Sequence, residues 1–166
     1  MLRLLALLAL LSSPALAGTL EGKVVGVVDG DTIDVLDGSK KQHRIRFDGI
    51  DAPERGQPFS QRAKSTLSDL VFGKTVKVET EGADKYNRTI GRIYVDGKDV
   101  GLAMLEAGMA WHYTKYDQSK KYADGEKAAK DARRGLWADP HHIPPWEWRK
   151  LDKSERDRNR SPQSVR

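Results

Sequence analysis

The sequence predicts an α+β domain built around a small β-barrel, and two patterns carry that prediction. Between residues 20 and 100, five short segments have the alternation or the β-branched composition of strands, with turn signals between them. Three longer stretches have the spacing or composition of helices and are interspersed with these strands or follow them. Strands interspersed with helices in one short chain favour an α+β domain around a small barrel.

The strand predictions rest on local composition. Residues 20–28 are rich in valine and flanked by glycines, and residues 43–47 alternate, with Arg44 and Arg46 on one face of the strand. The other predicted strands are residues 32–36, 76–79 and 90–95, the last turning through Asp96-Gly97 into the short run 98–100.

Each of the three predicted helices has an identifiable end. The first covers residues 58–72 and is followed by Gly73, a favoured residue just past a helix C-terminus. The second begins after Asp99, whose carboxylate can cap it, and ends at Gly108. The third covers residues 117–134 and stops at Gly135.

Residues 1–17 have the order of a secretory signal peptide. A positively charged start is followed by the apolar run 4–11 and by Ala15-Leu16-Ala17, a small-x-small cleavage signal before Gly18. The apolar run is too short to span a bilayer as a helix. An uncleaved N-terminal anchor is the alternative. We therefore expect a secreted or periplasmic protein without stable membrane association after cleavage.

The rest of the chain divides into a predicted domain at residues 18–148 and a tail at residues 149–166. Three prolines, at 140, 144 and 145, argue against a regular helix just before the boundary, where Trp146 and Trp148 can pack back onto the domain. The tail is charged and nearly free of apolar residues after Leu151, which predicts disorder.

Charge and cysteine content exclude several classes of function. Of the net charge of +5, +4 lies in the tail, which has seven Lys and Arg against three Asp and Glu, and the rest is Arg3, whereas residues 18–148 hold 21 of each sign. The basic balance therefore does not by itself identify the domain as a nucleic-acid binder. The chain has no cysteine, which excludes a disulfide framework, a zinc-thiolate site and a cysteine nucleophile.

A first candidate cluster is the run Val28-Asp29-Gly30-Asp31-Thr32. Its two carboxylates, two residues apart, can point into one site, although a simple turn between strands is the alternative for this run in isolation. An EF-hand is excluded, because a loop that starts at Asp29 has Asp34 where glycine is required and Lys40 where glutamate is required.

Two further clusters combine arginine with carboxylates. The segment 46–54 places Arg46, Asp51 and Glu54 around a glycine and a proline, and the segment 84–88 reads Asp-Lys-Tyr-Asn-Arg. Surface carboxylates beside an arginine are often only solvated salt bridges. Glycine and proline restrict the backbone on which Asp51 and Glu54 lie, which favours a fixed functional loop.

Taken in order, the three clusters resemble the staphylococcal nuclease family, whose pattern runs D-G-D-T, then R-x-x-x-(I/V)-D-x-P-E, then D-K-Y-G-R. The resemblance covers about residues 20 to 138 and ends in Gly135-Leu136-Trp137. It implies a five-stranded OB-fold β-barrel with three α-helices, in agreement with the α+β prediction.

The resemblance implies one calcium ion. Its ligands would be the carboxylates of Asp31 and Asp51 and the main-chain oxygen of Ala52, a hard-oxygen set that leaves positions for water and a phosphate oxygen. The family commonly has Thr at the position of Ala52, so any role of that hydroxyl is lost. Asn87 stands where the family has glycine, and asparagine tolerates a left-handed backbone.

The same resemblance implies the catalytic groups. Arg46 and Arg88 would hold the scissile phosphate, because guanidinium groups match phosphate oxygens and stabilise the charge of the transition state. Glu54 would act as the general base for the attacking water. The cut would break the bond to the 5′ oxygen and leave 3′-phosphate and 5′-hydroxyl ends.

Four residues are candidates for substrate binding. Lys85 and Tyr86 match family residues that contact a neighbouring phosphate. Tyr113 and Tyr116 are candidates for stacking on bases, with a place in the core as the alternative for either ring. The four histidines are interpreted as structural or surface residues.

The sequence therefore predicts a calcium-dependent phosphodiesterase that hydrolyses DNA and RNA, single-stranded or frayed, and acts as a monomer. A non-catalytic nucleic-acid-binding module on the same fold is the alternative. The chain retains the charged residues of the site, which argues against it: Asp31, Arg46, Asp51, Glu54 and Arg88. A two-carboxylate glycosidase is disfavoured, because two arginines beside a hard-cation site suit a phosphate better than a sugar.

Overall fold

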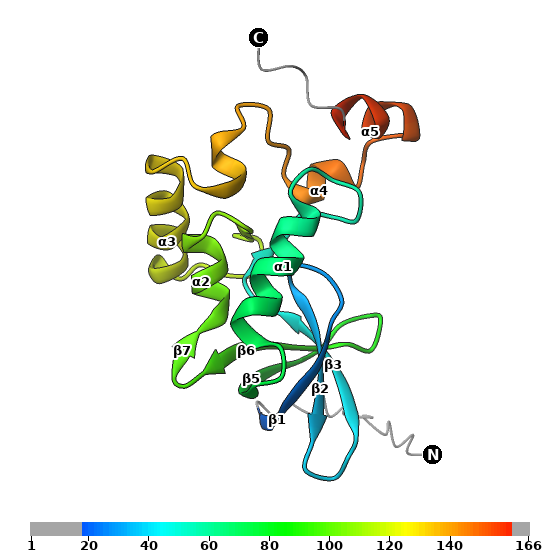
Figure 1. Cartoon of the computed structure of the whole chain (residues 1–166), viewed down its shortest axis with the longest axis vertical. Helices are drawn as coiled ribbons and strands as arrows, with labels where there is room; N and C mark the ends of the chain where they lie inside the picture. Colours follow the sequence, from blue (N-terminus) through cyan, green and yellow to red (C-terminus); the bar gives the residue numbers. More distant parts are fainter. Residues whose placement is uncertain (1–17, 161–166) are drawn as a thin grey trace, which may run out of the picture.

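The computed structural model describes residues 18–160 (Figure 1), so the predicted signal peptide at residues 1–17 and the last six residues of the predicted tail lie outside the described residues. Five strands form a closed barrel in the order β3-β2-β1-β5-β6, and a parallel pairing of β3 with β6 closes it. These strands are β1 (Gly18–Val27), β2 (Thr32–Asp37), β3 (Gln42–Phe47), β5 (Thr75–Ala83) and β6 (Thr89–Val95). The predicted barrel is confirmed.

Three two-residue strands complete the ladders of the described chain. β7 (Lys98–Asp99) pairs with the end of β6. Outside the barrel, β4 (Ile50–Asp51) pairs with β8 (Trp111–His112). The latter pairing fixes the backbone of Asp51 and was not predicted from the sequence.

The three predicted helices lie where expected. They are α1 (Ser60–Val71), α2 (Val100–Glu106) and α3 (Lys120–Asp131). The Asp99 carboxylate caps α2 by accepting from the Leu102 amide at 3.0 Å, and Gly73 has a φ of 75° just past the end of α1. α3 begins three residues later than predicted, because Asp117 is buried in ion pairs with His112 and Arg92 and Ser119 takes the capping position.

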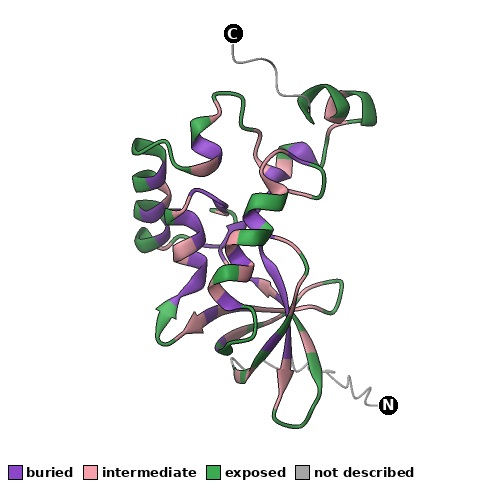
Figure 2. Ribbon diagram, in the orientation of Figure 1, coloured by how far each residue is buried: buried purple, intermediate pink, exposed green. Residues whose placement is uncertain are grey.

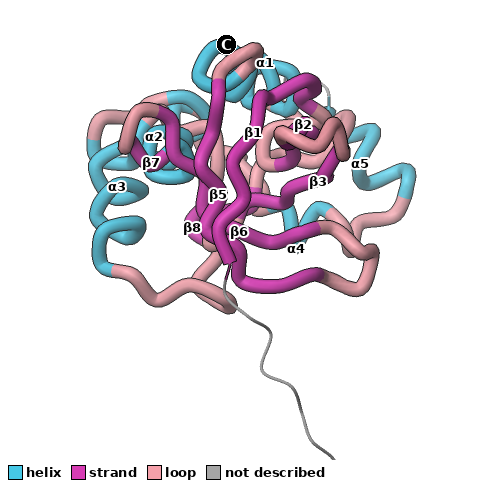
Figure 3. Tube along the Cα trace, turned by 90° about the horizontal axis from the view of Figure 1, so that it is seen from below, coloured by secondary structure: helices cyan, strands magenta, loops and turns pink. Residues whose placement is uncertain are grey.

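The core fills the barrel and the space beneath the helices. Figure 2 shows the buried residues concentrated where α1 and α2 meet the strands, and Figure 3 shows the helices around the strands. Members of this core with no exposed surface include Ile33, Val35, Ile45, Leu67, Val76, Val78, Ile93, Met104 and Leu105. A second cluster of Trp111, Ala129, Leu136 and Trp137 joins α3 to η1 (Gly135–Ala138).

The C-terminal segment corrects two expectations. A short helix, α4 (Pro145–Trp148), begins at a proline, which a first helical turn tolerates because that amide needs no partner. Residues 149–160, expected to be disordered, contain α5 (Lys153–Arg160). Composition was misleading here because the segment is held by contacts outside it, including the Arg160 guanidinium with the Gly56 carbonyl at 2.9 Å.

None of the helices formed by residues 18–160 combines the length and the apolar character that crossing a bilayer would require.

Gly49 connects the barrel to β4 and tolerates no side chain. Its φ is 72°, and a Cβ there would lie 2.9 Å from Cε2 of Tyr122 and 3.0 Å from Cβ of Asp117. Its carbonyl also accepts a hydrogen bond from the Tyr113 amide at 2.9 Å. The backbone that leads into Asp51 therefore depends on glycine for both conformation and space.

We expect Gly49→Ala to lower the free energy of unfolding by about 2–4 kcal/mol, from the left-handed backbone and the displaced Tyr122 ring together. Urea denaturation measures this change.

Two glycines provide matched controls. Gly73 also has a positive φ but has open space around its Cβ position, so Gly73→Ala isolates backbone strain, at about 1 kcal/mol. Gly38 has open space and no positive φ, so Gly38→Ala is expected to keep the wild-type stability. A loss at Gly49 no larger than that at Gly73 would contradict the steric explanation.

Candidate active site

Two buried carboxylates lie together at one end of the barrel. Asp31 lies just before β2 and Asp51 ends β4, and each is almost fully buried. Oδ2 of Asp31 accepts a hydrogen bond from the Ala52 amide at 2.7 Å, which ties the two loops together. The structure therefore brings together the three residues predicted to bind the metal.

The Arg46 guanidinium lies between these carboxylates. Its Nη2 is 3.2 Å from Oδ2 of Asp31 and 3.1 Å from Oδ1 of Asp51. Its Nη1 donates to the carbonyls of Phe47 at 2.6 Å and Ile50 at 2.9 Å. Arg46 thus fixes the backbone of the Asp51 loop in addition to balancing charge.

The sequence did not identify Arg149, which follows α4 and reaches the same carboxylates. Its Nη2 donates to Oδ2 of Asp51 at 2.8 Å, and its Nη1 lies 3.3 Å from Oδ1 of Asp51 and 2.5 Å from Oε1 of Glu54. Arg149 therefore connects the predicted metal ligand to the predicted general base. The flanking Trp146 and Trp148 were the sequence signal that this segment packs on the domain.

Negative charge exceeds positive charge in this cluster. Burial and the charge of Asp31 raise the pKa of Asp29 to about 6. Burial also raises the pKa of Asp51, although the hydrogen bonds from Arg149 oppose that shift. Three carboxylates, of Asp31, Asp51 and Glu54, contact two guanidinium groups, and the Asp29 carboxylate accepts from the Asp31 amide beside them. A further cation would stabilise this arrangement.

The donor set fits a hard divalent cation with an open coordination sphere. Within residues 18–160, no cluster of three or more His, Cys, Asp or Glu side chains could hold a metal ion. The protein can instead supply the carboxylates of Asp31 and Asp51 and the carbonyl of Ala52, and all of these donors are oxygen. Such a set suits calcium and leaves positions for water and substrate oxygens.

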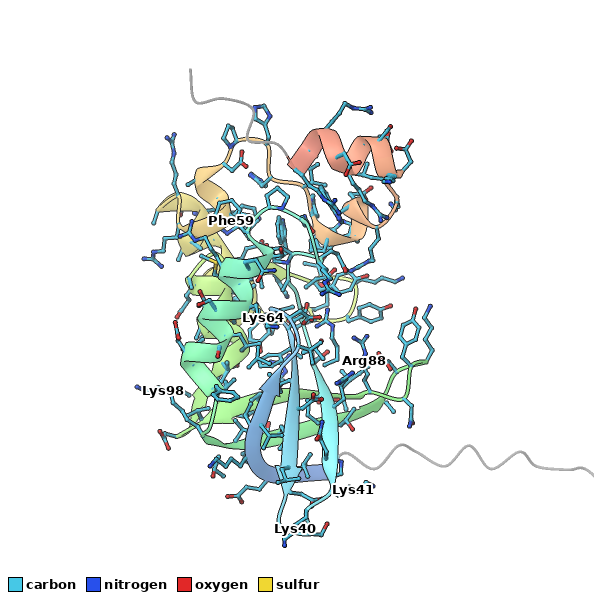
Figure 4. The ribbon with its side chains drawn as sticks, turned by 45° about the vertical axis from the view of Figure 1, so that its right-hand side comes forward. Lys40, Lys41, Phe59, Lys64, Arg88 and Lys98 are labelled. Carbon is cyan, nitrogen blue, oxygen red and sulfur yellow. The ribbon has the colours of Figure 1, made fainter. Side chains whose placement is uncertain are left out.

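Arg88 lies beside the barrel, at the base of the loop between β5 and β6 (Figure 4). Asn87 has a φ of 59°, the left-handed conformation expected where the family has glycine. The Arg88 guanidinium pairs with Asp84 of its own loop, with Nε 2.7 Å from Oδ2. Within the described chain, no hydrogen bond joins Arg88 to the metal-site carboxylates. The closing β3–β6 pairing nevertheless puts Arg88 next to the strand that carries Arg46.

The predicted substrate-binding residues form two separate groups. Lys85 and Tyr86 lie in the Arg88 loop, with Nζ of Lys85 4.9 Å from the centroid of the exposed Tyr86 ring. Tyr113 and Tyr116 make an edge-to-face pair at 4.9 Å, and Tyr116 is exposed. The other face of Tyr113 is stacked on Trp146 at 5.3 Å, a contact that the sequence did not reveal.

Three of the four histidines have side-chain partners in the structure, and His141 is exposed. Nε2 of His112 lies 2.8 Å from Oδ1 of Asp117, and Nε2 of His43 lies 2.7 Å from Oδ2 of Asp37. His142 contacts the Asp139 carbonyl through Nδ1 at 2.6 Å. None of these contacts involves Asp31, Asp51 or Glu54.

Comparison with known proteins identifies relatives over nearly the whole chain. Residues 44–139 match the family described as Staphylococcal nuclease homologue. The chain is 41% identical over 170 residues to Protein ParB of Escherichia coli, covering 95% of each protein. It is 38% identical over 160 residues to Micrococcal nuclease of Shigella flexneri, covering 90% of this chain and 91% of that protein. An Uncharacterized endonuclease of Escherichia coli is 41% identical over 143 residues, 86% of this chain and 93% of that protein.

The two arginines predicted to hold phosphate differ in structural role, which predicts different effects on stability. We expect Arg46→Lys to lower the free energy of unfolding by about 2–4 kcal/mol, because lysine cannot replace the planar fork that binds two carbonyls and two buried carboxylates. Arg88→Lys is expected to cost less than about 1 kcal/mol, since that ion pair is partly exposed. Equal losses in urea denaturation would contradict the assignment of Arg46 to the loop.

Proposed function

The chain belongs to the staphylococcal nuclease family and is a nuclease, and we propose that it is a calcium-dependent phosphodiesterase that cuts DNA and RNA to leave 3′-phosphate and 5′-hydroxyl ends. The observation that carries this proposal is the buried pair of Asp31 and Asp51 around one guanidinium, with Glu54 beside them. Carboxylate oxygens, arginine and a carboxylate base suit attack of water on a phosphodiester.

Asp31, Asp51 and the carbonyl of Ala52 would hold the cation. When bound, calcium supplies Lewis-acid and template chemistry by neutralising phosphate charge and aligning water with phosphorus. The burial of both carboxylates excludes bulk water from the ligands and so strengthens their interaction with positive charge.

Glu54 would accept a proton from the attacking water while the water oxygen forms a bond to phosphorus. The bond from phosphorus to the 5′ oxygen would break, and that oxygen would take a proton from solvent to become the 5′-hydroxyl, while Glu54 returns its proton to solvent. Arg46 and Arg88, on neighbouring strands or their ends, would donate to the non-bridging oxygens, where charge develops in the transition state.

Binding of the rest of the substrate would use both aromatic groups. Lys85 would contact a neighbouring phosphate with Tyr86, and Tyr113 or Tyr116 would stack on a base. Stacking requires unpaired bases, so we propose single-stranded or frayed DNA and RNA as substrates. We further propose that a monomer exported by its signal peptide performs the reaction, in the periplasm or outside the cell.

The calcium requirement is tested by nicking of supercoiled plasmid with calcium and with chelator. We expect Asp51→Asn to lower the calcium-dependent rate by about a hundredfold or more, because the amide keeps the shape but not the ligand charge. Asp131→Asn, at an exposed pair with Lys127, is the matched control and is expected to keep the wild-type rate. Full activity in chelator would overturn the calcium assignment, and no cleavage under any condition would favour the non-catalytic binding module.

The catalytic roles are tested by steady-state kinetics on a single-stranded oligonucleotide. We expect Glu54→Gln to lower kcat by about 10²–10⁴-fold with little change in KM, as for loss of a general base. Glu79→Gln, at an exposed pair with Lys77 on the barrel, is the control for loss of a carboxylate.

Arg88→Lys tests phosphate binding in the transition state. We expect kcat to fall by about 10²-fold with KM nearly unchanged, because lysine keeps the charge but loses the two-pronged donor. The variant should retain the wild-type calcium affinity, since Arg88 makes no contact with the metal-site carboxylates. A rise in KM at constant kcat would instead assign Arg88 to ground-state binding.

A further inference from the structure

Arg149 occupies the carboxylate oxygens that the proposed function assigns to calcium and to the attacking water. Oδ2 of Asp51 accepts from Nη2 of Arg149 at 2.8 Å, and Oδ1 of Asp51 is shared between Arg46 at 3.1 Å and Arg149 at 3.3 Å. Oε1 of Glu54 lies 2.5 Å from Nη1 of Arg149. Both oxygens of Asp51 are therefore engaged by guanidinium groups.

The position of Arg149 is built by the chain around it, here called the C-terminal arm (residues 143–160). Trp148 is 2% exposed, and Trp146 stacks on Tyr113 with the two rings 2° from parallel. These two contacts anchor the arm immediately before Arg149. The guanidinium is therefore directed at the carboxylates by packing, unlike a surface side chain that happens to meet an acid.

The arm is also attached to the loop that carries Glu54. Nε2 of Gln57 donates to the Ile143 carbonyl at 2.6 Å, and Oε1 of Gln57 accepts from the Glu54 amide at 2.9 Å. The Arg160 guanidinium donates to the Gly56 carbonyl at 2.9 Å. The base, the loop and the arm thus form one connected unit.

We propose that Arg149 is a positioning residue that competes with calcium for Asp51. In the metal-free protein its guanidinium takes the place of the metal cation and fixes the positions of the Asp51 and Glu54 carboxylates. This inference rests on the proposed function. The guanidinium of Arg149 lies 2.8 Å from Oδ2 of Asp51 and would repel a metal cation at that oxygen, so its hydrogen bonds raise the calcium concentration that the nuclease requires.

The physical basis is the charge of the cluster. Asp51 is 2% exposed, and a buried carboxylate without a compensating cation is strongly destabilising. Arg46 is one positive group shared between the two carboxylates of Asp31 and Asp51. In the metal-free state Arg149 supplies the second positive group that balances their charge. Since calcium and Arg149 compensate the same charge through the same oxygens, the binding of one weakens the binding of the other.

The test is isothermal titration calorimetry, in which calcium is titrated into the full chain without nucleic acid. The calcium Kd is compared between the wild type, Arg149→Gln and Lys150→Gln. We expect Arg149→Gln to lower the calcium Kd by about tenfold or more, from loss of charge-assisted hydrogen bonds that compete with the metal. Among residues 18–160, Lys150 pairs only with Glu147, and it is exposed. Lys150→Gln therefore removes the same charge from the adjacent position and should change Kd by less than about twofold.

A thermal measurement provides an independent readout. At one calcium concentration, the rise in Tm on adding calcium is expected to be larger for Arg149→Gln than for the wild type, because tighter binding to the folded state stabilises it more. Arg149→Lys keeps the positive charge but loses the fork, and its calcium affinity is expected to lie between those of the wild type and Arg149→Gln. This variant keeps the test decisive if Arg149→Gln does not fold.

The outcomes separate this inference from the proposed function. Calcium binding by the wild type together with equal or weaker binding by the Arg149 variants overturns the competition and assigns Arg149 to support of the ligands. Equal tightening by Arg149→Gln and Lys150→Gln overturns it as well, since net charge would then explain the effect. No calcium binding by any of the proteins overturns the calcium proposal itself, and the competition with it.

Discussion

One guanidinium, that of Arg46, holds the site together. It is shared between Asp31 and Asp51, and it also binds two main-chain carbonyls of the loop between β3 and β4. Without it, two nearly buried carboxylates would repel each other, and the loop between β3 and β4 would lose two of its hydrogen bonds. The loop conformation and the closeness of the two acids therefore depend on the same guanidinium that we propose to bind phosphate. A substitution there cannot change one of them alone.

Barrel closure determines what surrounds that interaction. The parallel pairing of β3 with β6 connects segments far apart in the sequence. It places the first residues of β6 beside β3, the strand that carries Arg46. Arg88 comes immediately before β6, so closure alone brings the second arginine to the same side of the barrel. A closed barrel also leaves no free edge that could shift register, which keeps these strand ends in place. The precision of the site is thus a property of the sheet as well as of the loops.

The sequence predicted what local patterns encode. Strand alternation, the Asp99 cap and the glycine after α1 each act within a few residues, and the structure has them where expected. The two-residue pairing of β4 with β8 was missed because two residues show no periodicity. Arg149 was missed for a related reason: it is 98 residues from Asp51, and its segment has the charged composition typical of disorder. Two tryptophans hold that segment, and their burial depends on a surface that only the folded domain provides.

The two guanidinium groups of the cluster differ in how easily they can leave it. Arg46 is largely buried and bound to main-chain carbonyls, so moving it requires rearrangement of the loop itself. The Arg149 side chain is 43% exposed, and within the described part of the chain its guanidinium is bound only to carboxylates. Water can therefore take the place of those carboxylates as its hydrogen-bond partner. A buried anionic cluster needs compensation whether or not a metal is present, and the fold meets that need with one permanent cation and one exchangeable cation. The exchangeable one lies on the C-terminal arm, outside the barrel, with its side chain partly in solvent.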